Sequence, residues 1–216
     1  KAQLDSAMDA AGRAFKTWKH DENQRRQALR DCATALKGRA SELAELLTKE
    51  QGKPLKNAIA EINSAAAFFE STADLQIPAE VLKDDERQRI ELRRKPFGVV
   101  AAITPWNFPV VLAVWKIAPA LLAGNTVILK PSPFTPLSSL MLGEILSGVL
   151  PRGVFNVVSG GDELGAWITA HPVVRKISFT GSVATGKKIA ATATPDLKAA
   201  TLELGGNDPA IVLKDV

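Results

Sequence analysis

Hydrophobic residues recur at helical spacing along the first third of the chain. Polar residues fill the positions between them, so each expected helix buries one face. The three apolar stripes are Leu4, Met8, Ala11, Phe15 and Trp18; Leu29, Cys32, Leu36, Ala40, Leu43 and Leu47; and Leu55, Ile59, Ile62, Ala66, Phe69 and Ala73. Asp21 is suited to cap the second helix, and Pro54 is suited to the first turn of the third.

Residues 86–95 follow a different pattern. Gln88, Ile90 and Leu92 alternate with charged residues, which predicts a strand with one charged face. Charged faces of this kind are typical of exposed or edge strands. We therefore expect this segment to lie outside the core.

From Phe97 onward, short apolar runs alternate with helical segments. Runs that are apolar on both faces indicate strands of a parallel sheet, and each run is followed by a helix. The expected strands are 98–103, 125–130, 153–158, 175–179 and 210–213, and the expected helices are 109–122, 136–149, 162–170 and 183–193. The sequence predicts an α/β fold with a Rossmann-like, mainly parallel sheet and flanking helices, preceded by amphipathic helices.

The charge of the chain is spread evenly. The net charge is +4, with 18 basic and 16 acidic residues up to position 96 and 9 and 7 after it. A nucleic-acid-binding protein concentrates its basic residues on one face or segment, so no nucleic-acid partner is expected. Residues 97–115 carry no charge and are long enough to raise the question of a membrane span. Pro105 and Pro109 interrupt a continuous helix there, so we expect no membrane partner.

Cys32 is the only cysteine, so an internal disulfide is impossible. This fits a reducing compartment, and no apolar signal segment occurs near residue 1, so we expect a cytoplasmic protein. Cys32 lies on the apolar stripe of its helix, which is the usual place of a small core residue. No metal site is expected.

The turns after the strands are the candidate sites, because ligands of open α/β sheets bind at the carboxyl ends of the strands. Residues 104–109 (TPWNFP) place Asn107 between two aromatic residues at the start of a buried helix. Its amide could donate to a developing oxyanion, or it could satisfy a local turn. Lys130 ends the next strand, where a lysine can bind a hydroxyl or phosphate group or remain solvated.

Residues 181–188 (GSVATGKK) form a glycine turn that enters a helix, which is a favourable arrangement for binding an anion. The segment nearly matches the P-loop pattern, but Lys188 replaces the Ser or Thr that would hold magnesium. A P-loop phosphohydrolase is therefore an alternative. No GxGxxG sequence is present.

Glu203 lies at a strand end before two glycines, in the segment LELGGNDP. Apolar neighbours could raise the pKa of its carboxyl group and make it a general base. It could equally be an exposed glutamate before a turn.

Five segments together resemble the aldehyde dehydrogenase superfamily in order and spacing. They are FGVVAAITPWNFP, AGNTVILKPS, GVFNVVSGG, ISFTGSVATGKKIA and LELGGNDPAIV. PWNFP, FTGS and LELGG are jointly very specific, and the resemblance runs from about residue 10 to the last residue. It implies a partial cofactor-binding domain in which residues 1–76 form N-terminal helices, 77–97 the strands of a projecting oligomerisation hairpin, and 98–216 the nucleotide-binding core.

The resemblance also implies roles for individual residues. Asn107 would supply the amide of an oxyanion hole, Glu203 would be the general base that activates water, and Lys116 would lie near the active site. Gly181 and Ser182 would contact the pyrophosphate of the cofactor. The residues expected to contact NAD or NADP are Thr104, Pro105, Trp106, Lys130, Ser132, Pro133, Gly161, Gly165, Phe179, Gly181, Ser182, Leu204 and Gly205.

Within that set, Lys130 and Ser132 would contact the adenosine ribose, Gly161 and Gly165 the adenine side, and Leu204 the nicotinamide. Pro133 stands where many NAD-preferring members have a glutamate, which leaves the choice between NAD and NADP open.

The family nucleophile is a cysteine that follows the position of Glu203 by a few tens of residues. The sequence reaches Val216 without it, so we expect a fragment that is truncated at both ends and lacks the catalytic domain. A sheet cut before its completion would expose an apolar edge and leave the isolated chain marginally folded.

The leading hypothesis is NAD(P)-dependent oxidation of an aldehyde to a carboxylic acid through a cysteine thiohemiacetal and thioester. This chain alone would be inactive. The expected partners are a small-molecule aldehyde and, in the full-length parent, further copies in a homodimer or homotetramer. The second hypothesis is a stand-alone nucleotide-binding module without catalysis.

Overall fold

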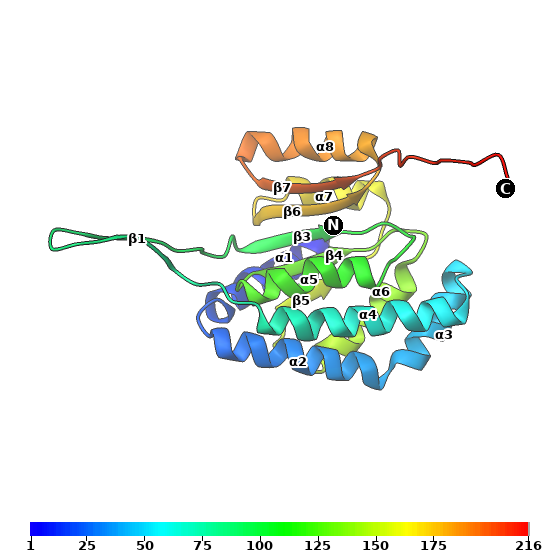
Figure 1. Ribbon diagram of the computed structural model, residues 1–216, viewed down its shortest axis with the longest axis horizontal. Coiled ribbons are helices and arrows are strands. Elements are labelled where there is room, and N and C mark those ends of the chain that lie inside the picture. Colours follow the sequence, from blue (N-terminus) through cyan, green and yellow to red (C-terminus); the bar gives the residue numbers. More distant parts are fainter. Residues whose placement is uncertain (216) are drawn as a thin grey trace.

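A five-stranded parallel sheet forms the centre of the molecule. The computed structural model describes residues 1–215. Within them the sheet has the strand order β5-β4-β3-β6-β7, with helices on both faces (Figure 1). The strands are β3 (Val99–Ile103), β4 (Thr126–Lys130), β5 (Phe155–Val157), β6 (Val174–Gly181) and β7 (Ala199–Leu204). The α/β fold with a parallel sheet is therefore confirmed.

Strand β3 occupies the middle of the sheet and is buried along its whole length. It runs parallel to β4 on one side and to β6 on the other, and Ile103 pairs with Lys130 in β4 and with Phe179 in β6. Each residue of β3 is small or apolar, so both faces of the strand can lie under helices. The carboxyl ends of the five strands consequently lie side by side at one end of the sheet.

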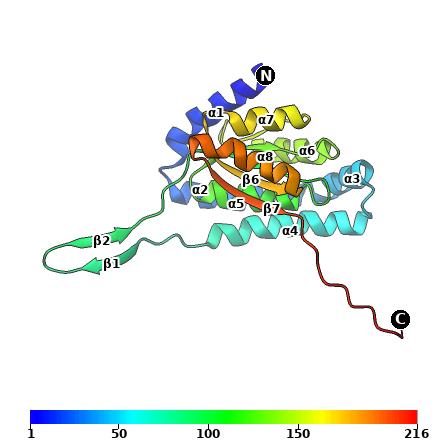
Figure 2. The same cartoon turned by 90° about the horizontal axis from the view of Figure 1, so that it is seen from above.

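Two hydrophobic clusters cover the two faces. One contains residues of α1 (Ala2–Trp18), α7 (Asp162–Ala170) and α8 (Val183–Ala193). The other contains residues of α5 (Val111–Leu122) and α6 (Pro136–Ser147), against which α2 (Glu22–Gly38), α3 (Ala40–Gln51) and α4 (Leu55–Asp74) pack as an outer layer (Figures 1 and 2). The N-terminal helices thus lie on opposite faces of one sheet.

The N-terminal stripes form four helices, not three. Gly38 ends α2, and Arg39 leaves the helical conformation with φ −117° and ψ 20°, so that α3 begins at Ala40. The apolar stripe continues across this break because both helices face the same core. Asp21 caps α2 as expected, since its carboxylate accepts a hydrogen bond from Gln24 N at 2.9 Å.

The first turn of α4 differs from the expectation. Leu55 and Ile59 were expected on the buried stripe but are 44% and 37% exposed, and Pro54 precedes the helix instead of lying within its first turn. The helix turns Ala58 and Glu61 inward at this end because Glu61 accepts hydrogen bonds from backbone N–H groups of the core.

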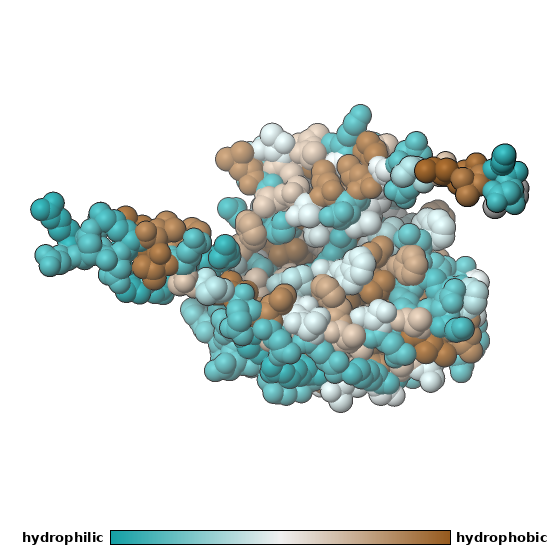
Figure 3. All heavy atoms as spheres, viewed as in Figure 1, coloured by the Kyte–Doolittle hydropathy of each residue, from teal (hydrophilic) through white to brown (hydrophobic). Residues whose placement is uncertain are grey.

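The strand expected at 210–213 is not formed. The last strand is β7, and residues 205–213 follow it without regular structure. Ile211, Val212 and Leu213 are 85%, 82% and 62% exposed, and no described strand pairs with them. They form the apolar patch on the C-terminal segment in Figure 3.

An antiparallel hairpin of β1 (Glu80–Asp84) and β2 (Arg89–Leu92) projects from the body (Figures 1 and 2). The charged strand expected at 86–95 is therefore present but shorter. Arg89 pairs with Asp84 at 2.6 Å and with Glu91 at 2.7 Å, on a solvated face.

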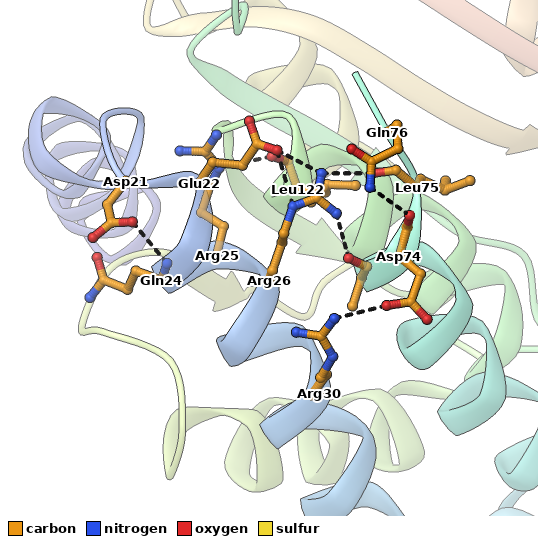
Figure 4. A network of polar contacts seen from close by, with 11 residues as sticks. Asp21, Glu22, Gln24, Arg25, Arg26, Arg30, Asp74, Leu75, Gln76 and Leu122 are labelled. Carbon is orange, nitrogen blue, oxygen red and sulfur yellow. Dashed lines mark hydrogen bonds and ion pairs between the residues drawn. The ribbon is translucent and has the colours of Figure 1, made fainter. Parts of the chain in front are cut away.

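Arginines of α2 fix the point where the hairpin leaves the body (Figure 4). Arg26 donates hydrogen bonds to the carbonyl oxygens of Ala73 at 2.5 Å and Leu75 at 2.8 Å, and Arg30 pairs with Asp74 at 2.8 Å. These cations lie at the carboxyl end of α4, where the helix dipole is negative. The contacts stabilise the end of α4 and with it the direction of the chain into β1.

No helix within residues 1–215 is both long enough and apolar enough to cross a membrane.

Gly153→Ala is expected to destabilise the fold strongly. Gly153 has φ +86°, and a Cβ atom there would lie 2.6 Å from the backbone oxygen of Ala10 in α1. The backbone conformation alone costs a non-glycine residue ~1–3 kcal/mol, and the clash adds to this. Urea denaturation measures the change in unfolding free energy.

Gly38→Ala is the matched control. No atom lies within 4 Å of a Cβ atom at Gly38, and its φ is negative. Its effect should stay below ~1 kcal/mol. Equal unfolding midpoints for the two variants would contradict the packing of α1 against the turn before β5.

Candidate functional site

An open cleft of about 1040 Å³ lies at the carboxyl ends of β3, β6 and β7. It brings together the three residues expected to carry chemistry, Asn107, Lys116 and Glu203. The expected cofactor contacts that also line it are Pro105, Trp106, Gly181, Ser182, Leu204 and Gly205. Residues from three separate strand–turn segments therefore share one cleft, which follows from the parallel arrangement of the strands.

Asn107 lies exposed in the turn between β3 and α5. Its side-chain oxygen accepts a hydrogen bond from Phe108 N at 3.1 Å. Its backbone oxygen accepts hydrogen bonds from Gln51 at 2.7 Å and Lys53 at 2.8 Å. Among the described residues, no partner uses the side-chain NH₂ group, so Asn107 keeps the donor that an oxyanion would need.

Lys116 lies buried in α5, beneath β6. Its ammonium group donates hydrogen bonds to the hydroxyl oxygens of Thr180 at 2.8 Å and Ser178 at 3.4 Å. Burial lowers the pKa of Lys116, and the nearby carboxylate of Glu203 opposes this shift. The cleft therefore holds a desolvated cation close to a carboxylate.

Glu203 occupies β7, where it is paired with Thr180 of β6. The side chain is exposed, because β7 is the last strand on its side of the sheet. Leu204 is paired with Gly181 in the same register, and its side chain packs over Gly186 of α8. A Cβ atom at Gly186 would lie 2.6 Å from Leu204 Cδ2.

The turn at Gly181 and Ser182 leads into α8. Ser182 caps the helix, since its hydroxyl accepts a hydrogen bond from Thr185 N at 3.2 Å. A Cβ atom at Gly181 would lie 2.6 Å from the ring of Phe179, so the close packing of this turn requires glycine. The N–H groups of the first helical turn before Thr185 lack partners within the helix, as at any helix start, which suits a phosphate group.

This geometry argues against a P-loop. Helix α8 begins at Val183, so Gly186 and Lys187 lie inside the helix and not at the end of a phosphate-wrapping loop. The P-loop alternative is therefore set aside.

Lys130 ends β4 and lies in a second region at the carboxyl ends of the strands. It is buried, and its ammonium group donates a hydrogen bond to Pro131 O at 3.2 Å. Its stem packs against Gly165, where a Cβ atom would lie 3.6 Å from Lys130 Cε. Burial lowers the pKa of Lys130, and the carboxylate of Asp162 opposes the shift.

The two regions lie on either side of β3. Lys130 and Phe179 both pair with Ile103, so they are two strand spacings apart, about 10 Å. A ligand that contacts Lys130 and the turn at Gly181 would have to extend across the end of β3. Such a span is compatible with an elongated dinucleotide.

The remaining expected contacts lie outside this cleft and differ in exposure. Ser132 is buried, and its hydroxyl accepts a hydrogen bond from Phe134 N at 3.2 Å, whereas Pro133 is exposed. Thr104 is also buried, and its hydroxyl has no partner among the described residues. Gly161 lines a separate cleft of about 910 Å³ between α1 and α7.

Cys32 is fully buried in α2, and burial raises the pKa of its thiol to about 12. A thiol in this state remains protonated and inaccessible, so Cys32 is not a nucleophile for this cleft.

Three residues at the site were not identified from the sequence: Gln51, Lys53 and Glu61. All three contact the chain from Trp106 to Val111. Glu61 carried a detectable signal, because it is a charged residue on the buried face of an amphipathic helix, and such residues are rarely buried unless paired. Gln51 and Lys53 carried none, since they are polar residues at the end of α3 and just after it.

The fold and the cleft define an α/β protein suited to binding a nucleotide. The family model described as aldehyde dehydrogenase family matches residues 1–216. The peroxisomal aminoaldehyde dehydrogenase 1 of Pisum sativum is 45% identical over 233 residues, covering 100% of this chain and 46% of that protein. The chain belongs to the aldehyde dehydrogenase family.

Solved structures agree with this assignment. An NADP-dependent enzyme of E. coli is 40% identical with a TM-score of 0.91, over 95% of this chain and 44% of that one. PnpE in complex with nicotinamide adenine dinucleotide is 39% identical with a TM-score of 0.91, over 95% of this chain and 43% of that one. The chain spans 45–46% of the length of the first curated relatives that it matches.

Glu203→Gln is expected to lower the pKa of Lys116 further. The carboxylate of Glu203 favours the charged form of the lysine, so its removal leaves the cost of burial unopposed. A pH titration of the Lys116 side chain by NMR measures the shift. Glu91→Gln, on the distant hairpin, should leave the Lys116 pKa unchanged. An unchanged pKa in Glu203→Gln would show that the two groups do not interact, and a raised pKa would contradict the stabilisation of the charged lysine by the carboxylate.

Proposed function

We propose that the protein containing this chain oxidises an aldehyde to a carboxylic acid with NAD⁺ or NADP⁺. The observation that carries the proposal is the convergence of Asn107, Lys116 and Glu203 in one cleft beside the turn at Gly181 and Ser182. Membership in the aldehyde dehydrogenase family supports it. A nucleotide-binding module without catalysis would need the turn but not the other three residues.

Each residue of the cleft has a proposed task. The amide of Asn107 donates to the oxyanion that forms when a thiol adds to the aldehyde carbonyl. The adduct would become a thioester only after giving up hydride to the bound cofactor, and Glu203 would then accept a proton from the water that hydrolyses this thioester. Lys116 balances the charge of Glu203. The thiol is proposed to come from outside residues 1–216, because Cys32 is buried.

The residues at the carboxyl ends of the strands fit a nicotinamide dinucleotide. When bound, this cofactor supplies the hydride acceptor. Its pyrophosphate is proposed to lie on Gly181 and Ser182, where the amides of α8 are open. Its adenosine ribose is proposed to contact Lys130 and Ser132, and its nicotinamide Leu204. The further proposed contacts are Thr104, Pro105, Trp106, Pro133, Gly161, Gly165, Phe179 and Gly205.

Pro133 is proposed to allow both NAD and NADP. A proline offers no carboxylate to repel a 2′-phosphate and none to bind a ribose hydroxyl. The neighbours include an enzyme described as NADP dependent and another bound to nicotinamide adenine dinucleotide, which supports either cofactor in this fold.

Residues 77–97 are proposed to join copies of the parent protein into a dimer or tetramer, with residues 1–76 as helices and 98–216 as the nucleotide-binding core. Apolar side chains on the hairpin support this, since Val81, Leu82, Ile90 and Leu92 are exposed (Figure 3). A cytoplasmic location is proposed because the single cysteine is a free thiol.

Lys130→Met is expected to raise the Kd for NAD⁺ ~10–100-fold, because hydrogen bonds from a charged group contribute ~1.5–3 kcal/mol. Isothermal titration calorimetry measures the Kd. Lys187→Met, in exposed α8, should bind NAD⁺ like the parent. The reverse order of affinities would favour a P-loop type of site.

Asn107→Ala is expected to lower the kcat of aldehyde oxidation by the full-length protein ~10²–10³-fold, because one oxyanion-hole donor is lost. Steady-state assays with a saturating cofactor concentration measure this rate. Asn63→Ala, an exposed substitution in α4, is the control. A kcat for Asn107→Ala equal to that of the control would remove Asn107 from the mechanism.

A further inference from the structure

The carboxylate of Glu61 lies at the start of α5, although its own helix is α4. The side chain is fully buried, with 0% of its surface exposed. One oxygen accepts hydrogen bonds from Val110 N at 2.9 Å and Val111 N at 3.1 Å. The other accepts a hydrogen bond from Lys53 Nζ at 2.5 Å. These amides belong to the residues that follow the turn containing Asn107.

Two further side chains reach the same segment, one from the last residue of α3 and one from the connection between α3 and α4. Lys53 Nζ donates a hydrogen bond to Asn107 O at 2.8 Å and lies 3.9 Å from the centre of the Phe108 ring. Gln51 Nε2 donates hydrogen bonds to Trp106 O at 2.8 Å and Asn107 O at 2.7 Å. The backbone around Asn107 is thus held from outside by three polar side chains.

These contacts have a physical reason. The first amides of a helix lack partners within the helix and favour a negative charge. The residues before α5 have no regular structure, so their carbonyl groups need donors from elsewhere. Glu61 supplies the negative charge at the amides and Lys53 supplies a donor to the carbonyl of Asn107, and such charge-assisted hydrogen bonds are shorter and stronger than neutral ones.

A buried ion pair is a costly way to hold a chain together, because both charges lose their hydration. Apolar residues of similar volume would fill the space between α4 and α5 without this cost. Apolar residues could not form the hydrogen bonds by which Lys53 and Glu61 hold backbone groups of the turn and of the start of α5. The bonds of this ion pair end at Asn107 and at the two residues that begin α5.

We propose that Gln51, Lys53 and Glu61 are positioning residues that hold Asn107 in the orientation for binding an oxyanion. This inference rests on the proposed function. None of the three touches the reacting atoms. They act through the backbone of residues 106–111, and a shift of this backbone moves the amide of Asn107 away from its target.

The test compares Lys53→Met with Lys56→Met in the full-length protein. Methionine keeps the stem of Lys53 but removes its three donors. Lys56 is exposed in the first turn of α4, so its variant makes the same change of charge without touching the turn. Aldehyde oxidation is measured together with the KM for the cofactor and the melting temperature.

We expect Lys53→Met to lower kcat ~10–100-fold, because displacements of about 1 Å are enough to cause such losses. The KM for the cofactor should remain unchanged, and Lys53→Arg should restore part of the rate. Equal kcat values for Lys53→Met and Lys56→Met would overturn the inference. So would a parallel change in the cofactor KM, which would indicate a general loss of structure.

Gln51→Ala keeps the test decisive if Lys53→Met does not fold. It removes two hydrogen bonds from a half-buried side chain and leaves the ion pair intact. Faster amide hydrogen exchange at Asn107, Phe108 and Val110, with unchanged exchange in β3, supports the inference. Unchanged exchange in the turn overturns it.

This exchange measurement also separates the two proposals. A full-length protein without aldehyde oxidation contradicts the proposed function, whereas the hydrogen exchange of the turn still tests the contacts of Gln51.

Discussion

The parallel pairing of β3 with β4 and β6 is the constraint on which the candidate site depends. All residues of β3 are buried, and the strand can be covered on both faces because its side chains are small or apolar. Parallel pairing places the carboxyl ends of the strands at one end of the sheet, so the turns after these strands lie next to one another. Asn107, Lys130 and Gly181 end or follow neighbouring strands, so this pairing brings them to the same end of the sheet.

The helices contribute a buried lysine to the site and fix the position of the turn that carries Asn107. Lys116 reaches β6 from α5, and its burial lowers its pKa. The start of α5 is itself fixed by Glu61 from α4. Helices distant in sequence thus decide where an exposed turn places its side chains, and the outer layer of α3 and α4 contributes to the geometry of the cleft.

The sequence predicted the strand–turn–helix order and the residues at the strand ends, because both follow from local hydrophobic patterns and from motifs. It failed where tertiary contacts override these patterns. Leu55 and Ile59 are exposed because Glu61 turns the other face of α4 inward, and the apolar run at 210–213 is exposed because no described strand pairs with it. Lys53 and Glu61 stand eight positions apart and meet residues about fifty positions away, so no local pattern marks their shared task.

The central claim is that the carboxyl ends of β4, β3 and β6 bind a nicotinamide dinucleotide. Titrating the ¹⁵N-labelled chain with NAD⁺ and following its amide chemical shifts tests this claim most directly. The account predicts shifts at Lys130, Gly165, Gly181 and Ser182, on both sides of β3. Shifts confined to the separate cleft between α1 and α7, or none at saturating NAD⁺, would contradict it.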